Sequence, residues 1–318
     1  MNYTKLITAF VVILFSIGES WAQRYETEIT DSITVNTYKY ATKDGEDLNF
    51  DIYMPALEFE SKKVVFLYVH GGGFSGGDRS GGKSFCTRLA KYGYAAISMS
   101  YRLTRKGTKT GFGCECAAND KLATFQAAVE DVQDATAYLI QNREQFGIDP
   151  QKIILGGSSA GAETVLNAAY QPPYCYGLDS GPVSYAGVIS MAGAIPDLVK
   201  VYGESAIPSM FFHGTCDNLV PYASAPHHYC KETDAGYIIL HGGYSIAEKF
   251  RELGKPYWLV TICGGAHEWA GKPMTVYFNE IVRFCNEFVI EGKKQQIHTI
   301  VPGDQTKCNY QTFNFCNE

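Results

Sequence analysis

The chain has 318 residues and a formal net charge of −6, and 46% of its residues are hydrophobic. This composition excludes an intrinsically disordered protein and predicts a globular chain of one large domain or two small ones. Because the balance is acidic and no long basic block occurs, nucleic acid is not an expected partner.

The N-terminus has the pattern of a secretory signal peptide. One positive charge lies in residues 1–5, an apolar run covers residues 6–18, and Ser20-Trp21-Ala22 places small residues at the two positions that a signal peptidase reads. An uncleaved membrane anchor is the alternative, but the run is shorter than the roughly 20 residues that a spanning helix needs. We therefore expect cleavage after Ala22, a secreted or periplasmic protein, and no stable membrane insertion.

Ten cysteines follow this segment, and an even number in an exported chain is typical of structural disulfides. They are Cys86, Cys114, Cys116, Cys175, Cys216, Cys230, Cys263, Cys285, Cys308 and Cys316. Only one residue separates Cys114 from Cys116, too few for a typical zinc pair, so we expect no metal. Neither the connectivity of the disulfides nor the oligomeric state follows from the sequence.

Strand and helix patterns alternate along most of the chain. Strand patterns cover residues 32–42, 48–54, 63–69, 94–100, 152–156, 183–192, 209–213 and 257–262. Helical patterns cover residues 84–92, 118–146, 162–170, 244–253 and 275–290. This alternation predicts an α/β fold with a mostly parallel eight-stranded sheet, helices on both faces and two antiparallel strands at the start.

The same pattern predicts a simple domain organisation. No repeat and no Pro/Ser-rich linker interrupts the chain, so residues 23–291 are expected to form one domain after a signal peptide at residues 1–22. Residues 292–318 are more polar, and we interpret them as a wrapping tail that Cys308 or Cys316 pins to the domain.

The stretch Gly157-Ser158-Ser159-Ala160-Gly161 is a G-x-S-x-G motif between a predicted strand and an Ala-rich predicted helix. A simple strand-to-helix turn is the alternative, because this short motif is common by chance. In the strand–helix context, however, small residues let the chain reverse sharply and expose the serine hydroxyl at the carboxyl end of a strand. Ser159 is therefore the candidate nucleophile.

Three other predicted strand ends carry the groups that an activated serine needs for attack on an ester. His70-Gly71-Gly72-Gly73 follows strand 63–69, where bare backbone N–H groups of Gly72 and Gly73 can join that of Ala160 as oxyanion donors; a flexible turn is the alternative. Asp217 follows strand 209–213 and could instead cap a turn. His267, in a Gly-rich loop after the last strand, is the candidate base.

The remaining histidines are weaker candidates for the base. His213 is expected to be buried at a strand end, His227 and His228 to lie at the rim of the site, and His241 to cap the following helix.

With these motifs in place, the chain resembles an α/β-hydrolase over about residues 33–290. It is similar to the esterase branch with an HGGG oxyanion motif, which includes hormone-sensitive-lipase-like and type-B carboxylesterases. The order Ser159, Asp217, His267 is the order of the catalytic triad in that fold. The resemblance implies that Ser159 attacks, His267 transfers the proton, Asp217 orients the imidazole, and Gly72, Gly73 and Ala160 stabilise the oxyanion, without metal or cofactor.

The chain departs from these relatives in one informative way. Only about residues 23–31 precede the first strand, where hormone-sensitive-lipase-like enzymes carry a helical cap, and type-B enzymes are much longer. We therefore expect little or no cap and an open site. An open site suits short-chain or aromatic acyl esters, including acetyl or feruloyl groups on plant polysaccharides, better than the substrates of a lidded lipase.

Two other functions are compatible with the same fold. A peptidase or amidase would use the same triad, and a non-catalytic binding module would use the same scaffold. The complete set of catalytic groups argues against the second. A further hypothesis concerns Cys216, beside Asp217, and Cys263, four residues before His267: a disulfide between them would join the acid loop to the base loop.

Overall fold

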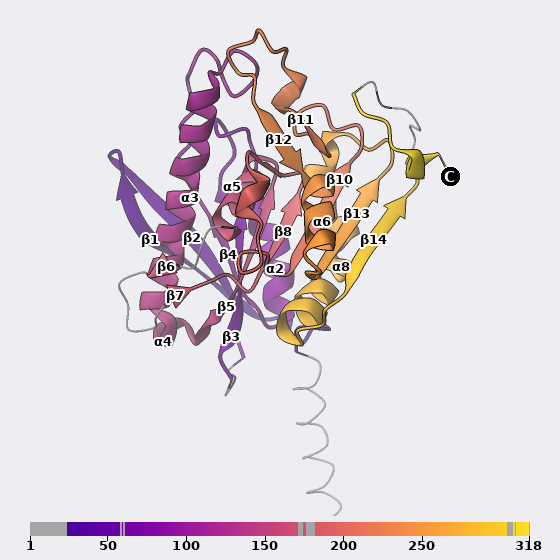
Figure 1. Cartoon of the computed structure of the whole chain (residues 1–318). Coiled ribbons are helices and arrows are strands. Elements are labelled where there is room, and N and C mark those ends of the chain that lie inside the picture. Colours follow the sequence, from indigo (N-terminus) through magenta and orange to yellow (C-terminus); the bar gives the residue numbers. More distant parts are fainter. Residues whose placement is uncertain are drawn as a thin grey trace, which may run out of the picture.

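The computed structural model describes residues 24–57, 59, 61–170, 174–175, 182–303, 308 and 310–317, with only the backbone at 174–175 and 182–183. Its centre is a twisted nine-stranded sheet with helices on both faces (Figure 1). The predicted signal peptide lies outside the described residues.

The sheet has the strand order β1-β2-β4-β3-β5-β8-β10-β13-β14, and two small sheets, β11-β12-β9 and β6-β7, accompany it. The strands are β1 (Ile33–Lys43), β2 (Glu46–Pro55), β3 (Lys63–Val69), β4 (Ala95–Met99), β5 (Ile148–Ser158), β6 (Tyr174–Cys175), β7 (Pro182–Val183), β8 (Gly187–Met191), β9 (Ala194–Ile195), β10 (Ser209–Gly214), β11 (Ser224–Pro226), β12 (Ile239–Gly242), β13 (Tyr257–Ile262) and β14 (Gln296–Val301).

Helices connect most neighbouring strands of the large sheet. The α-helices are α2 (Lys83–Lys91), α3 (Ala118–Gln141), α4 (Arg143–Phe146), α5 (Ala160–Ala169), α6 (Gly243–Glu252), α7 (Pro273–Val276) and α8 (Phe278–Phe284). The shorter helical turns are η1 (Arg79–Gly82), η2 (Leu198–Lys200), η3 (His227–Tyr229), η4 (His267–Ala270) and η6 (Asn314–Cys316), and η5 (Cys285–Ile290) is a π-helix.

Strand β3 shows how the sequence forms a core on both faces of the sheet. All seven of its residues are buried. Side chains point alternately to opposite faces of a strand, so Val65, Leu67 and Val69 belong to the hydrophobic cluster that contains residues of α3, α5 and α6, whereas Val64, Phe66 and Tyr68 belong to the one that contains residues of α2 and α8. A continuous apolar run is therefore the signature of this doubly covered strand.

The parallel part of the sheet brings the candidate site residues to one edge. Strand β2 is antiparallel to β1 and to β4, as predicted, and all pairs from β4 to β14 are parallel. Strands β3, β5, β10 and β13 therefore end at the same edge. The chain order reverses around β3, and ligand sites of open α/β sheets lie outside the carboxyl ends at such a reversal.

The α/β class and the mostly parallel sheet are confirmed, but the expected count of eight strands is too low. The ninth strand, β14, comes from the predicted tail and pairs in parallel with β13. Its exposed and half-buried residues alternate, a strand pattern that the overall polarity of this segment obscures. The predicted helix at residues 118–146 is divided at Asn142, and the one at 275–290 becomes α7, α8 and η5.

Candidate active site

Ser159 lies at a sharp turn between β5 and α5. Its backbone has φ 53° and ψ −122°, a conformation that non-glycine residues rarely adopt and that often marks a functional site. The turn requires close packing, because a Cβ on Gly161 would overlap with the backbone carbonyl of Val69 at the end of β3. The Ser159 N–H donates to the Met191 carbonyl oxygen at 2.9 Å, which fixes the turn to the end of β8.

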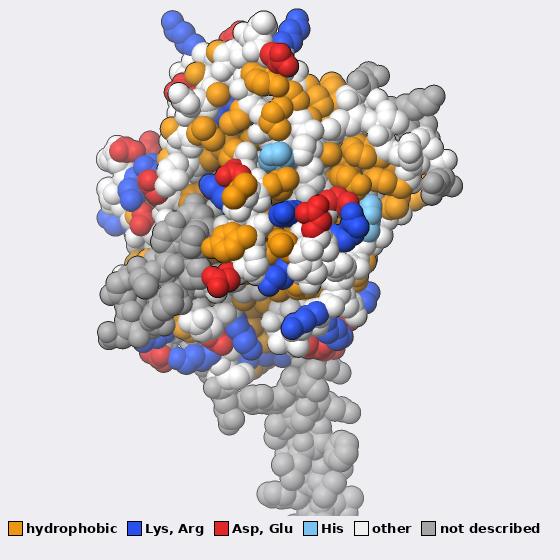
Figure 2. Space-filling model, viewed as in Figure 1, with side chains coloured by type: hydrophobic (Ala, Val, Ile, Leu, Met, Phe, Trp, Pro, Cys, Tyr) orange, Lys and Arg blue, Asp and Glu red, His pale blue; other side chains and the backbone are white. Residues whose placement is uncertain are grey.

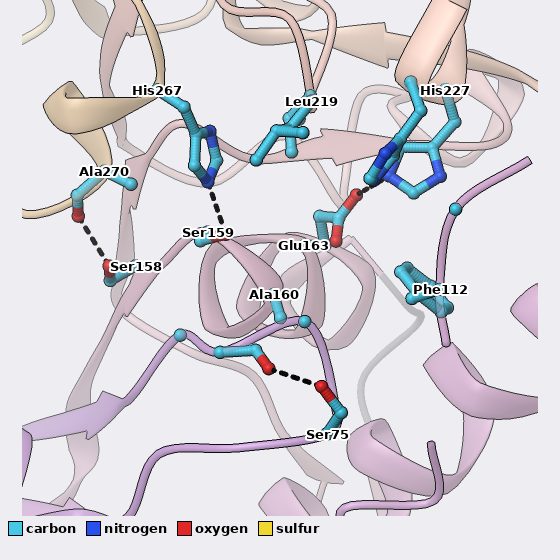
Figure 3. Close-up of a pocket in the computed structure, with 16 residues that line it drawn as sticks. Ser75, Phe112, Ser158, Ser159, Ala160, Glu163, Leu219, His227, His267 and Ala270 are labelled. Atoms are coloured by element: carbon cyan, nitrogen blue, oxygen red, sulfur yellow. Dashed lines mark hydrogen bonds and ion pairs between the residues drawn. The ribbon is translucent and has the colours of Figure 1, made fainter. Parts of the chain in front are cut away.

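The three predicted catalytic side chains form a continuous hydrogen-bonded line. Ser159 Oγ lies 2.7 Å from His267 Nε2 (Figure 3), and His267 Nδ1 lies 2.7 Å from Asp217 Oδ2. Asp217 and His267 follow the adjacent strands β10 and β13, which pair in parallel from Ser209–Tyr257 to Gly214–Ile262. The structure thus brings together three residues from three strand ends, separated by up to 108 positions.

Asp217 is fully buried and held by several donors. Its Oδ1 accepts from the N–H groups of Leu219 at 2.9 Å and Val220 at 3.0 Å. Its Oδ2 also lies 3.5 Å from Nε2 of the buried His213. Burial alone would raise the pKa of Asp217, but the hydrogen bonds from His213 and His267 outweigh burial and hold the pKa well below its usual value. The carboxylate is therefore ionised at neutral pH.

His213 completes the environment of this carboxylate. Gly243 N–H points at His213 Nδ1 from 3.4 Å, so the ring proton resides on Nε2, which faces the Val220 carbonyl oxygen at 3.1 Å as well as Asp217. The prediction of a buried His213 is confirmed, but its contact with Asp217 was not anticipated. The spacing of four residues between them was the only available signal.

The glycine loop after β3 lies beside the Ser159 turn. Gly72 and Gly73 have φ values of +122° and +59°, which favour glycine. The Gly72 carbonyl oxygen accepts from Ser75 N and Gly76 N, both at 3.1 Å, which curls the loop. Within the described part of the chain, the N–H groups of Gly72 and Gly73 have no acceptor. They are thus available to a ligand.

A pocket of about 580 Å³ opens above these groups. It is lined by Gly71, Gly72, Gly73, Ser75, Phe112, Gly113, Ser158, Ser159, Ala160, Glu163, Leu219, Val220, His227, His228, His267 and Ala270. His227 and His228 both line the pocket, but His227 is buried, so its predicted rim position is wrong. Phe112 and Glu163 were not anticipated; the only signal for Glu163 was its place in the first turn of the helix that follows Ser159.

The wall of the pocket is built from two loops that a disulfide joins. Cys114, two residues after Phe112, is bonded to Cys230, three residues after His227. Among the described residues, the group best placed to hold a metal consists of these two cysteines and Asp234. Since the disulfide removes both thiolates, this group lacks the ligands that a metal site needs.

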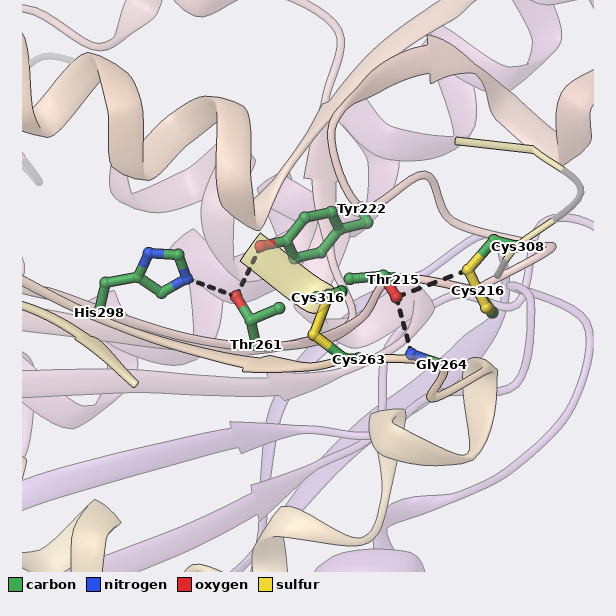
Figure 4. Close-up of a disulfide and its surroundings, with 9 residues drawn as sticks. All are labelled: Thr215, Cys216, Tyr222, Thr261, Cys263, Gly264, His298, Cys308 and Cys316. Atoms are coloured by element: carbon green, nitrogen blue, oxygen red, sulfur yellow. Dashed lines mark hydrogen bonds between the residues drawn. A yellow bond between two sulfur atoms is a disulfide. The ribbon is translucent and has the colours of Figure 1, made fainter. Parts of the chain in front are cut away.

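The C-terminal tail is bonded to both loops that carry the acid and the base (Figure 4). Cys216 pairs with Cys308 and Cys263 pairs with Cys316, so the predicted Cys216–Cys263 disulfide is wrong. The physical reason is β14: since it runs parallel to β13, the tail leaves the sheet at the edge where Cys216 and Cys263 lie. The tail is therefore pinned by both of its cysteines.

Other side chains near the site take structural roles. His241 Nδ1 lies 2.7 Å from Ser224 Oγ on the neighbouring strand β11, and no side chain caps α6, so the predicted helix cap is wrong.

Figure 2 shows acidic and basic side chains interspersed with hydrophobic ones on the face of the molecule that is seen in Figure 1. Within the described ranges, no helix has the length and apolar character needed to cross a membrane.

Comparison with known families supports the resemblance expected from the motifs. Residues 50–174 match the family described as BD-FAE, and residues 114–254 match the family described as Phospholipase/Carboxylesterase. The fold is similar to that of esterase 2 from Thermogutta terrifontis, with a TM-score of 0.58 and 21% identity over 86% of this chain and 96% of that one. The chain thus has the α/β-hydrolase fold.

The chain is also similar in sequence to several curated hydrolases. The chain is 29% identical over 126 residues to lipase 2 of a Moraxella species, covering 38% of this chain and 25% of the relative. It is 27% identical to ethyl acetate hydrolase of Pseudomonas putida, over 43% of this chain and 39% of that relative. It is 28% identical to chlorogenic acid esterase of Aspergillus niger, over 58% of this chain and 35% of that relative. The chain therefore spans well under half the length of these relatives, which are named as a lipase, an acetate ester hydrolase and an esterase.

Proposed function

We propose that the protein is a secreted serine carboxylic-ester hydrolase that works through an acyl-enzyme. The observation that carries this proposal is the unbroken line from Ser159 Oγ through His267 to buried Asp217, at the mouth of a pocket. The names of the curated relatives, which include an ethyl acetate hydrolase and a chlorogenic acid esterase, support ester hydrolysis.

The geometry accounts for activation of the serine. Asp217 is an ionised acceptor, so His267 keeps a proton on Nδ1 and presents the lone pair of Nε2 to the Ser159 hydroxyl at 2.7 Å. As Ser159 Oγ attacks the ester carbon, Nε2 takes its proton and then gives it to the leaving alcohol. A water molecule then attacks the acyl-enzyme with the same help from His267, and the acid is released.

The oxyanion would be stabilised by backbone N–H groups of Gly72, Gly73 and Ala160. Gly72 and Gly73 lie in the curled loop, and Ala160 is the first residue of α5. The positive end of the helix dipole adds to this stabilisation. Fixed donors of this kind stabilise the charge that develops in the transition state more than the neutral ester.

The proposed substrates are esters with short-chain or aromatic acyl groups, including acyl groups carried by polysaccharides. A pocket of about 580 Å³ accepts a small acyl group, and Phe112 offers an aromatic wall. A panel from acetyl and butyryl to feruloyl and long-chain esters, with acetylated xylan, tests this range. Preference for the long-chain esters would reject it.

Secretion is the remaining part of the proposal. The signal pattern at residues 1–22 and the three disulfides support an oxidising destination, either extracellular or periplasmic. N-terminal sequencing of the protein isolated from each cell fraction tests it. A mature chain that begins at Gln23 outside the cytoplasm is expected, and an intact Met1 in the cytoplasm would contradict export.

The catalytic assignment is tested with Ser159→Ala. We expect loss of turnover of p-nitrophenyl acetate by roughly 10³-fold or more and loss of labelling by a fluorophosphonate probe. Ser158→Ala is the matched control, because the Ser158 hydroxyl donates to the Ala270 carbonyl oxygen at 2.6 Å instead of contacting His267. This variant should still be labelled by the probe. Labelled Ser159→Ala would reject the proposal, and a matched amide substrate separates an esterase from an amidase.

A further inference from the structure

Two buried polar side chains at the inner end of the pocket take no part in the mechanism above. Glu163 and His227 are each 1% exposed, and both line the pocket. Glu163 Oε1 and His227 Nδ1 have no hydrogen-bond partner among the described residues. Glu163 Oε1 and His227 Nε2 are 3.6 Å apart, longer than a good hydrogen bond. Unpaired buried polar atoms are rare in folded proteins, and they call for a ligand or a water.

Their position relative to Ser159 is fixed by the helix. Glu163 follows Ser159 by four residues, and its N–H donates to the Ser159 carbonyl oxygen at 2.9 Å. A helical side chain leans towards the N-terminus of its helix, which is the end of α5 where Ser159 lies. The Glu163 carboxyl group therefore lies inside the same pocket as Ser159 (Figure 3).

The chemistry of the pair suits a hydroxyl group. Burial raises the pKa of Glu163 well above its usual value and lowers that of His227 well below, which favours the neutral form of each side chain. Lys121, whose charge would favour an ionised Glu163, donates to the Gly236 carbonyl oxygen at 2.7 Å and has its own pKa lowered by burial. A neutral carboxylic acid and a neutral imidazole each offer a donor and an acceptor, which a hydroxyl can match with its own acceptor and donor.

The mechanism indicates which part of the ester reaches them. His267 Nε2 must protonate the leaving alcohol, so the alcohol lies on the His267 side of Ser159. In Figure 3, Leu219 stands between His267 and the Glu163–His227 pair, and Phe112 lines the same inner end. The acyl chain therefore extends towards the pair.

We propose that Glu163 and His227 form a specificity subsite that hydrogen-bonds a hydroxyl group on the acyl chain, so that the enzyme prefers hydroxylated acyl esters to their unsubstituted counterparts. This inference rests on the proposed esterase function. A site built to bind a hydroxyl discriminates against the analogue without it, because the buried polar groups are then left unpaired.

The wild-type protein provides the first test. The specificity constant kcat/KM is measured for p-nitrophenyl esters of hexanoic, 3-hydroxyhexanoic and 6-hydroxyhexanoic acids, with the acetate as reference. We expect at least one hydroxylated ester to exceed the hexanoate by about 10-fold, the value of one buried hydrogen bond. Equal or lower values for both would overturn the inference and assign the unpaired atoms to a bound water. Ethyl hexanoate and 2-hydroxyethyl hexanoate form a second pair, which differs by a hydroxyl group on the alcohol. A hydroxyl preference in this pair alone would overturn the inference that the subsite binds the acyl chain.

Variants provide the second test. Glu163→Met keeps the length of the side chain without its polar atoms and should remove the hydroxyl preference, whereas Glu163→Gln keeps a donor and an acceptor and should retain it. Thr164→Val is the control, since Thr164 is equally buried on α5 but outside the pocket lining. An unchanged preference in Glu163→Met would overturn the inference. Thermal unfolding checks each fold, and His227→Phe repeats the test if Glu163→Met does not fold.

Failure of the inference and failure of the proposed function give different results. If the wild type hydrolyses the acetate but shows no hydroxyl preference, only the subsite is rejected. If it hydrolyses none of the esters and no fluorophosphonate labels Ser159, the esterase proposal itself is rejected.

Discussion

The two halves of the site are held in place by different means. The nucleophile half consists of the ends of β3 and β5 with the start of α5, and its Ser159 turn is packed against buried central strands. The acid–base half consists of the loops after β10 and β13, which lie at the same carboxyl ends but further along the sheet, towards β14. Each of these loops is bonded by a disulfide to the C-terminal tail, at Cys216 and Cys263.

This difference follows from the position of each half in the sheet. Strand β3 has neighbours on both sides and helices on both faces, so backbone packing alone can fix the turn that follows. Strands β10 and β13 are also buried, but β13 is followed in the sheet by β14, the last strand, whose residues are exposed or half-buried. Covalent bonds to the tail restrict the loops after β10 and β13 in addition to packing. Changes in the two halves should therefore give different symptoms.

The largest expected effect is on catalysis, in the acid–base half. Asp217→Asn should lower kcat for p-nitrophenyl acetate by about 10⁴-fold, because an amide no longer stabilises the tautomer and the charge of His267. Steady-state kinetics measure the effect, and fluorophosphonate labelling of the variant should slow in parallel. A loss of less than 10-fold would mean that Asp217 only caps its turn.

Removal of one tail disulfide should have the next largest effect. The Cys216–Cys308 bond encloses a loop with a sequence separation of 92, and loss of such a bond costs roughly 2–5 kcal/mol. The double variant Cys216→Ser/Cys308→Ser should therefore lower the free energy of unfolding by that amount and also lower kcat, because the Asp217 loop is freed. Denaturant unfolding and steady-state kinetics measure the two effects.

The matched control is the disulfide of the pocket wall. Cys114→Ser/Cys230→Ser opens a loop of similar length, with a separation of 116, so its loss of stability should be similar. This bond joins the loops of Phe112 and His227, however, and its loss should raise KM more than it lowers kcat. Identical kinetic changes in both double variants would contradict a distinct role for the tail.

A smaller effect is expected from a packing change in the nucleophile half. Gly161→Ala places a Cβ against the Val69 carbonyl group, and such overpacking costs about 1–3 kcal/mol, partly offset by the better helix propensity of alanine. Thermal unfolding should show a lower Tm. Gly203→Ala is the control, because nothing lies within 4 Å of the Cβ that the alanine would add. The Tm of this variant should not fall.

The contrast also explains what the sequence could predict. Ser159 and the glycine loop are predicted from local patterns, because a turn of this kind needs adjacent small residues after a continuous apolar strand. Asp217 and His267 are predicted only from their place after successive strands. The partners of Cys216 and Cys263 were predicted wrongly, because pairing depends on where β14 carries the tail, and its alternation was overlooked beside its polarity.

The smallest expected effect is the pH dependence of stability that Asp217 confers. Burial opposes its ionisation, but the hydrogen bonds from His213 and His267 lower its pKa in the folded state below that of about 3.9 in an unfolded chain. The unfolded chain then binds the proton first as pH falls, so the stabilisation is complete above the unfolded pKa and is lost as pH falls towards the folded one. The difference in unfolding free energy between wild type and Asp217→Asn should be constant above pH 5 and should shrink by about 1 kcal/mol at pH 3. Denaturant unfolding across this range measures it, and a difference that stays constant to pH 3 would show that the two histidines do not favour the charged form of Asp217.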